Sequence, residues 1–448
     1  MITVMVNRLL INRAFAGVWS AGAVSWVGDF VFDTTVLLWI STVLAKDQPW
    51  APAAASGVLL AVLVPGVIAG PIAGVFVDRW DPRRTMLWSD AIRAVLVGAL
   101  VVLPLLPAGT LPVAVQLTIV YATVVLNTIV SRFFTPARFT IIADIVPEAD
   151  QPRAAGITQA TSAAAGIVGP PLAAPLLFTA GIEWALVVNA LSFVLSYLII
   201  WKVRTPKIER KPAPTGERGS GFWQEFLVGV QTIGRSQVLL AILIMGMIAN
   251  IAAQTFNALG VFFVTDNLNT PARYFGLQDA VMGVGVVVGA ALAGWLAPRL
   301  GYTRTIWGSM LAFGLCLGVY ARTTSFVVAL LILLLAAVPL GGMNTAMSPL
   351  MIQTVPREVL GRVFATFVPG VQSIGIAGVA FAGWISSSVL RDLDTELLGV
   401  HFGTYDTVFL CAGLIVVASG LYGMVALRRA TQTSENAAAQ AAAHSRGE

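Results

Sequence analysis

Long apolar stretches, separated by short polar segments, dominate this chain of 448 residues. A bilayer core is about 30 Å thick, and about 20 apolar residues in a helix are needed to cross it. Most of the stretches reach that length, and the longest polar segment, Lys202–Gln224, divides them into two groups of six. The predicted spans lie at 14–45, 53–77, 88–107, 112–135, 154–179, 183–201, 237–265, 272–297, 305–322, 325–350, 362–390 and 403–427.

This pattern predicts an all-α membrane protein. Because lipid offers no hydrogen-bond partners, a spanning segment must satisfy its backbone amide and carbonyl groups internally, as a helix does. We therefore expect twelve transmembrane helices in two pseudo-symmetric six-helix bundles. The expected domains are an N-terminal bundle at 1–201, a cytoplasmic linker at 202–236, a C-terminal bundle at 237–427 and a disordered cytoplasmic tail at 428–448.

An internal repeat supports the duplication. The segment GVFVDRWDPRRT, which begins at Gly74, matches GWLAPRLGYTRT, which begins at Gly294. The segment VPEADQPR, which ends at Arg153, matches VPREVLGR, which ends at Arg362. The two pairs are offset by 220 and 209 residues. Similar offsets at two places indicate duplicated halves, and an even number of spans gives both halves the same orientation in the membrane.

The composition agrees with a lipid environment, and the basic residues predict the topology. Apolar residues make up 57% of the chain and charged residues 11%, whereas about a quarter of the residues of a soluble domain are charged. Lys and Arg accumulate on the cytoplasmic side of membrane proteins. Both termini and the central linker are therefore expected to be cytoplasmic, in a bacterial inner membrane. The opposite loops hold only Lys46, Arg273, Arg322 and Arg391.

Several classes of function lack the residues that they require. The chain has two histidines and two cysteines, and it has no phosphate-binding loop of the G-x-x-x-x-G-K type. We therefore expect no enzyme activity, no cofactor and no metal site. The net charge of +5 follows from the topology and does not indicate a nucleic-acid partner. The expected partners are a small-molecule substrate, protons and the lipid bilayer, with the chain as a monomer.

The segment after the second span carries a motif. Gly74, Asp78 and Arg79, followed after one extra residue by Arg83 and Arg84, resemble G-x-x-x-D-R-x-x-R-R, which joins helices two and three in the major facilitator superfamily. The segments SWVGDF, SDAIRA and FFTPARFTIIADIVP resemble its drug-exporter branch, which includes macrolide and enterobactin exporters. The resemblance covers nearly the whole chain and implies the major facilitator fold.

The same resemblance implies a cytoplasmic gate. In the family, the aspartate at the position of Asp78 faces the N-terminus of helix eleven and nearby arginines, and it stabilises the outward-open state. Pro298 replaces this aspartate in the second half, so the contact is expected to be weaker there. The alternative is that the basic cluster is only a topology signal. The expected gating residues are Gly74, Asp78, Arg79, Arg83, Arg84, Asp90, Arg93, Arg132, Asp144, Arg153 and Arg362.

The fifth predicted span resembles an antiporter motif. Gly156, Gly169 and Pro170 match G-x8-G-x3-G-P-x2-G-G, with alanine at three of its glycine positions. In the family this motif distinguishes exporters from importers. An equally simple interpretation is close helix packing by small residues, with a bend at the Gly-Pro pair.

Ionisable residues inside the predicted spans are the best candidates for function. Asp29 and Asp33 are four residues apart in the first span, so they share a helical face, with Trp26 one turn earlier. Two carboxylates this close in a low-dielectric cavity disfavour each other's ionisation. One of them can then hold a proton and release it when access switches. The alternative is a structural carboxylate paired with an arginine, which suits Asp29 as well as the cavity does; for Asp33 the cavity is favoured.

Other polar residues in the spans complete the predicted cavity. Asn250, Gln254 and Asn257 share one face of the seventh span, and such a stripe must face protein or water. Asp279, in the eighth span, faces either the cavity or the outer vestibule. Single polar residues in four further spans are each explained by an interhelical hydrogen bond, but together they suit the lining of a cavity. These residues are Asn127, Gln159, Asn344 and Gln372.

These observations predict a secondary active exporter of small amphipathic compounds, such as a drug or a siderophore. The expected mechanism is proton antiport with alternating access. The alternatives are an importer or lipid flippase of the same fold, and a membrane scaffold or sensor that transports nothing.

Overall fold

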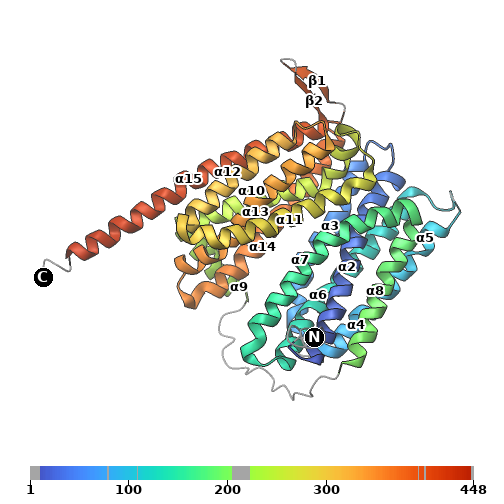
Figure 1. Ribbon diagram of the computed structural model, residues 1–448, viewed down its shortest axis with the longest axis horizontal. Helices are drawn as coiled ribbons and strands as arrows, with labels where there is room; N and C mark the ends of the chain where they lie inside the picture. Colours follow the sequence, from blue (N-terminus) through green and yellow to red (C-terminus); the bar gives the residue numbers. More distant parts are fainter. Residues whose placement is uncertain are drawn as a thin grey trace, which may run out of the picture. The chain divides into compact units, whose positions relative to one another are not determined.

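Long helices form nearly all of the structure, which is a computed structural model that describes residues 11–77, 80–107, 109–203, 222–391, 393–397 and 400–444 (Figure 1). Twelve of the helices each overlap one of the twelve predicted apolar stretches. The helices are α2 Arg13–Trp39, α3 Ala51–Val77, α4 Pro82–Leu100, α5 Val102–Leu105, α6 Val113–Ile145, α7 Gln151–Pro175, α8 Ile182–Lys202, α9 Phe222–Arg235, α10 Gln237–Phe262, α11 Phe275–Leu300, α12 Tyr302–Tyr320, α13 Phe326–Thr354, α14 Arg357–Ser387 and α15 Thr404–His444.

Short elements extend or connect these helices. Wide π-helical turns follow three of them, at η1 Ile40–Leu44, η3 Leu176–Ala180 and η4 Phe263–Asn267. Two 3₁₀ turns precede α7 and α11, at η2 Glu148–Asp150 and η5 Ala272–Tyr274. Strands β1 Asp394–Leu397 and β2 Val400–Gly403 form an antiparallel hairpin before α15, in which Asp394 pairs with Gly403.

Within the described residues, eleven helical segments are long and apolar enough to cross a membrane. The one remaining predicted span, 305–322, corresponds to α12, which is 19 residues long. Its first turn, Tyr302–Thr305, is polar and includes Arg304, which lowers the mean hydropathy of the helix. The twelve-helix membrane architecture predicted from the sequence is therefore confirmed.

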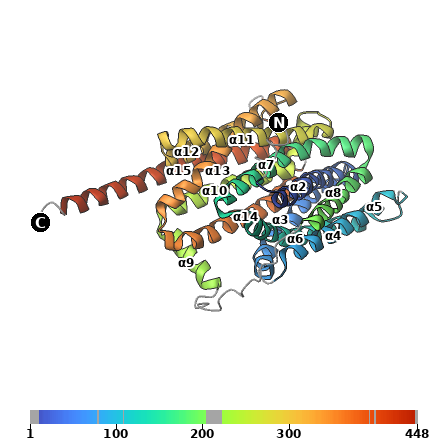
Figure 2. The ribbon, with the colours of Figure 1, turned by 60° about the horizontal axis from the view of Figure 1, so that its bottom comes forward.

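The described chain forms two compact units. The first contains α2 to α8 together with Asn269–Gly283, and the second contains α9, α10, η4 and the described residues from Val284 onward. In the first unit, α2 packs on α7 and α8, and α4 packs on α6 and α8; Figure 2 shows α2 beside α8. In the second unit, α10 packs on α14 and α15, and α12 packs on α13 and α15. Because each pair recurs at the repeat-related position, the two halves are duplicates, as the repeated segments predicted.

Each unit has its own apolar core. In the first unit, Phe15, Met86, Phe134 and Ile200 form part of a buried cluster where the ends of α2, α4, α6 and α8 meet. In the second unit, the ring of Tyr320 contacts those of Phe256, Phe263 and Phe409, with centroids 4.7–5.8 Å apart. These clusters hold the spanning helices together at their ends, because aromatic pairs add to the contact energy of buried surface.

Two segments differ from the sequence prediction. Helix α9 lies within the expected linker at 202–236, and its Gly229 packs closely against Thr366 and the Arg362 carbonyl of α14. Helix α15 continues to His444, through most of the tail that was expected to be disordered. Alanine, glutamine and glutamate dominate that tail and favour helix, so a helix that already exists can extend through it.

Candidate functional site

An arginine inside the first unit connects four helices. The Arg93 guanidinium, on α4, forms an ion pair with the Asp29 carboxylate of α2. It also donates to the Asn127 side-chain oxygen of α6 at 3.1 Å and lies over the Phe193 ring of α8, 3.9 Å from its centroid. Arg93 is only 2% exposed and Asp29 is 28% exposed. The pair is thus mostly shielded from solvent. The attraction between opposite charges is stronger in such an interior than in water.

A second carboxylate lies one turn away from this arginine. Asp90, on α4, is fully buried, and its Oδ2 atom accepts a hydrogen bond from the Ser196 hydroxyl of α8 at 2.6 Å. Its Oδ1 atom has no hydrogen-bond partner among the described residues. Because positions i and i+3 share a helical face, Arg93 and Asp90 also attract each other. Arg93 therefore has two acidic groups within its reach, Asp29 and Asp90.

The backbone of α2 comes close to α8 beside this network. Gly28 faces the polar side chains of Asn189 and Ser192, and a side chain at Gly28 would collide with both. The Ser192 hydroxyl donates to the Asn189 carbonyl at 2.7 Å, and the Asn189 Nδ2 atom is buried without a partner among the described residues. A glycine next to Asp29 thus lets α2 come close to the polar side chains of α8.

Asp33 lies one turn beyond Asp29 on α2 and is exposed within its own unit. Its carboxylate attracts the guanidinium of Arg132, on α6. It also repels the carboxylate of Asp29. Gly66 of α3 makes room for Arg132, because a Cβ atom there would contact the guanidinium. Asp29 and Asp33 are therefore close enough to influence each other's charge, and Arg132 is close to Asp33.

Sequence reasoning missed Arg138 of α6. This residue is 4% exposed, and its guanidinium lies over the ring of Trp26 at 4.1 Å and that of Phe139 at 5.4 Å. No acidic partner for it is present among the described residues, and its Nε atom is buried without a hydrogen bond. Trp26, which was expected in the cavity, packs on this cation. The sequence offered only a weak signal for Arg138, because it lies three residues beyond the end of the predicted span at 112–135.

The expected gating residues lie in several parts of the structure. Arg93 and Asp90 lie in the buried network with Asp29. Arg83 donates to the Trp201 carbonyl at 2.5 Å and so covers the end of α8. Asp78 and Arg79 lie outside the described residues, and Gly74 lies in the last turns of α3. The remaining members lie at helix ends, namely Arg84 on α4, Asp144 on α6, Arg153 on α7 and Arg362 on α14.

The glycines of α7 fit the helix-packing interpretation of the antiporter-like motif. Gly169 packs against Phe30 of α2, so closely that a Cβ atom there would collide with it. Pro170 contacts Gly276, at the start of α11. Gly156, in contrast, faces open space. Gly169 therefore brings α7 close to α2 directly beside Asp29, while Pro170 contacts α11.

The other cavity candidates are spread over both units. In the second unit, the Asn257 Nδ2 atom donates to Gln254 at 2.9 Å, and Asn250 lies against Gly375. Asp279, half-buried in the first unit, shares a face of α11 with Gly276 and Gly283, both of which pack on α7. Three further candidates are exposed within their own units, namely Gln159, Asn344 and Gln372.

Comparisons with known proteins agree with this architecture. A sequence model of the Major Facilitator Superfamily matches residues 18–262 and 245–446. "Macrolide efflux protein A" of Streptococcus pyogenes is 24% identical over 360 residues, which cover 78% of this chain and 84% of the relative. "Uncharacterized MFS-type transporter YfiS" of Bacillus subtilis (strain 168) is 24% identical over 431 residues, covering 93% and 95%.

The fold is also found among solved structures. That of the nucleoside transporter NupG superimposes with a TM-score of 0.67 at 12% sequence identity, over 93% of this chain and 99% of that chain. At this identity the likeness concerns the fold alone. The family model covers nearly the whole sequence, and the duplicated helical units agree with it. The chain belongs to the Major Facilitator Superfamily.

Proposed function

We propose that this chain exports a small amphipathic compound across the bacterial cytoplasmic membrane by proton antiport, as a monomer with both termini in the cytoplasm. The observation that carries the proposal is the ion pair between Asp29 and Arg93, set among four spanning helices with Asp33 one turn away. Ionisable groups at such depth are costly in a membrane protein, and they are retained mainly where protons or substrates pass.

The proposed cycle uses Arg93 as a cation with two alternative partners. When Asp29 takes up a proton, its attraction to Arg93 is lost, and the guanidinium is left buried beside Asn127. The unpartnered Oδ1 atom of Asp90, one turn away on the same helix, can then accept a hydrogen bond from it. A proton on Asp29 would thus loosen the contact between α2 and α4, which is the kind of change that biases two access states.

Asp33 is proposed to be the group that exchanges the proton. It is exposed within its unit, whereas Asp29 is engaged by Arg93. The nearby Arg132 guanidinium favours a charged Asp33, whereas the nearby Asp29 carboxylate disfavours it. Proton uptake at Asp33 removes a negative charge beside Asp29, so the two sites are coupled.

The direction of transport and the class of substrate are proposed from the relatives and the spans. The Streptococcus pyogenes relative is named as a macrolide efflux protein, which favours export of an organic compound. The polar positions predicted to line the cavity are few and mostly uncharged. Such a lining suits a substrate that is bound mainly by apolar contact, with a few hydrogen bonds that orient it.

Transport in proteoliposomes tests this function. The protein is reconstituted with erythromycin or the dye ethidium as probe, with and without an imposed pH gradient. Gradient-dependent movement of either probe, abolished by a protonophore, is the expected result. Protein-dependent movement that is unaffected by the gradient would contradict proton antiport. The Asp29→Asn, Asp33→Asn and Arg93→Gln variants should each lose the dependence on the gradient. Arg273→Gln, in the turn η5 that precedes α11, is the matched control.

A further inference from the structure

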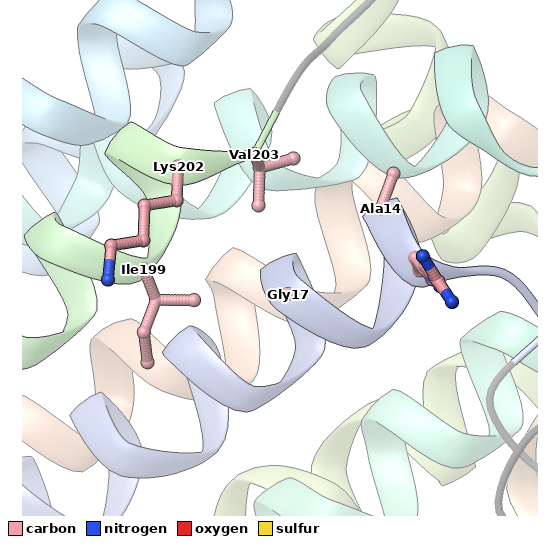
Figure 3. A pocket seen from close by; sticks show the side chains of 6 residues that line it. Ala14, Gly17, Ile199, Lys202 and Val203 are labelled. Atoms are coloured by element: carbon pink, nitrogen blue, oxygen red, sulfur yellow. The ribbon is translucent and has the colours of Figure 1, made fainter.

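A pocket lies where the first residues of α2 meet the last residues of α8. It has a volume of about 420 Å³ and is lined by Arg13, Ala14 and Gly17 on one side and by Ile199, Lys202 and Val203 on the other. Figure 3 shows the side chains of Ile199, Lys202 and Val203 opposite Ala14. The lining combines two cations with an apolar floor, and no acidic side chain belongs to it among the residues that the structure describes.

The pocket carries positive charge from several sources. Arg13 and Lys202 are exposed, and neither has an acidic partner among the described residues. Arg13 is also the first residue of α2, where the unpaired backbone amides give a helix a partial positive charge. At the end of α8, Arg83 donates to the carbonyls of Ile200 and Trp201, which offsets the negative end of that helix. An anion therefore suits this pocket better than a cation or a neutral group does.

The outer face of α8 places the pocket at the surface of the bilayer. Trp184 and Trp201 are both exposed and lie 17 residues apart, which is about 26 Å along a helix. Tryptophan prefers the two membrane–water interfaces, so this separation matches one bilayer core. Between them runs an exposed apolar stripe of Val188, Leu191, Leu195 and Leu198. Lys202 and the pocket thus lie at one interface, next to a surface that contacts lipid chains.

We infer that this pocket binds the headgroup of an anionic phospholipid. Arg13 and Lys202 contact the phosphate, Ile199 and Val203 contact the glycerol region, and an acyl chain follows the exposed stripe of α8. A soluble anion would use the two cations but would gain nothing from the apolar floor or from the stripe. Basic pockets between spanning helices on the cytoplasmic side are a recurrent form of lipid site, and the distribution of Lys and Arg predicts that side for this pocket.

Native mass spectrometry and lipid exchange test the inference without any transport assay. The full-length protein is purified, and its retention of phosphatidylglycerol is compared with its retention of phosphatidylcholine. Arg13→Gln and Lys202→Gln should each lower the preference for phosphatidylglycerol about fivefold, and together about 25-fold, given the usual contribution of one basic residue. Arg13→Lys and Lys202→Arg keep the charge and should keep the preference. Arg273→Gln removes the same charge elsewhere and is the matched control.

Three outcomes would overturn the inference. The double variant could retain phosphatidylglycerol as well as the unchanged protein does. The control Arg273→Gln could lower retention as much as Lys202→Gln, which would indicate a diffuse effect of charge. Millimolar inorganic phosphate could displace the lipid, which would indicate a site for soluble anions. Because Arg13 and Lys202 are exposed, the variants are expected to fold, and an unchanged melting temperature in phosphatidylcholine verifies this. The lipid-retention measurement does not depend on transport, so the lipid inference and the proposed proton antiport can be contradicted independently.

Discussion

Arg93 has partners on three other helices, so its removal should have a larger effect than that of a typical membrane residue. Breaking a buried ion pair by removing one partner leaves an uncompensated charge and costs about 3–5 kcal/mol. Asp29 is 28% exposed, so the lower end of that range is expected for Asp29→Asn. The double variant Asp29→Asn, Arg93→Gln should be less destabilised than the sum of the single variants. The free energy of unfolding in mixed detergent micelles gives this comparison, and additive losses would mean that the two groups do not interact.

Arg138 should behave in the opposite way. It is 4% exposed and has no acidic partner among the described residues, so its burial is not offset by an ion pair. Arg138→Met keeps contact with the Trp26 ring and loses a cation–π interaction of about 1–2 kcal/mol, while it removes the cost of desolvating the charge. The same unfolding measurement should find Arg138→Met neutral or stabilising and Arg93→Met strongly destabilising. Equal losses of unfolding free energy in both variants would show that the acidic partner of Arg93 does not affect stability.

The sequence identified part of this network. Asp29, Asp33 and Asn127 stand out because each is polar within an apolar run. Arg93 was grouped with the gate because the third span was expected to begin at residue 88, whereas α4 begins at Pro82. The residue therefore lies eleven positions into the helix, about 16 Å along its axis. A span boundary read from hydropathy cannot reveal this, because the polar first turn is helical as well.

Close packing of α7 on α2 gives a prediction about helices. Gly169 lies against Phe30 without room for a Cβ atom, whereas Gly156 on the same helix faces open space. Gly169→Ala should therefore separate α7 from α2 and destabilise the first unit, with a loss of about 1–3 kcal/mol from overpacking. Gly156→Ala should stabilise it by about 0.5–1 kcal/mol, because alanine favours helix. The melting temperatures of the two variants test this prediction. Equal changes in both would argue against the close contact between Gly169 and Phe30.

Helix α9 is the element that hydropathy could not find. It is 14 residues long, and its Gly229 packs on α14. Ile233 is buried, whereas Leu227 and Val230 are exposed. A short amphipathic helix has no continuous apolar run, and its stability depends on the surface that it packs against. The membrane spans needed no such partner information, because each of them is long and apolar throughout.

At the scale of the whole molecule, the architecture was predictable and the orientation stays a prediction. Twelve apolar stretches and two repeated segments were enough for two duplicated helical units. Thr110 and Glu148 are exposed at opposite ends of α6, so cysteines placed there should be labelled from opposite sides of the membrane, with Glu148 on the cytoplasmic side. The native Cys316 and Cys411 are replaced first. Labelling of both engineered cysteines from outside intact cells would contradict the topology.

The most direct test of proton coupling is substrate-dependent proton flux in proteoliposomes. The unchanged protein, Asp29→Asn, Asp33→Asn and the control Arg273→Gln are compared under the same pH gradient. We expect the addition of erythromycin or ethidium to start proton movement in the unchanged protein and the control. Asp33→Asn should still exchange the probe down its own gradient but should show no coupled proton flux, since the side chain is permanently neutral. Unchanged flux in both aspartate variants would contradict the account, because it would remove the α2 carboxylates from the mechanism.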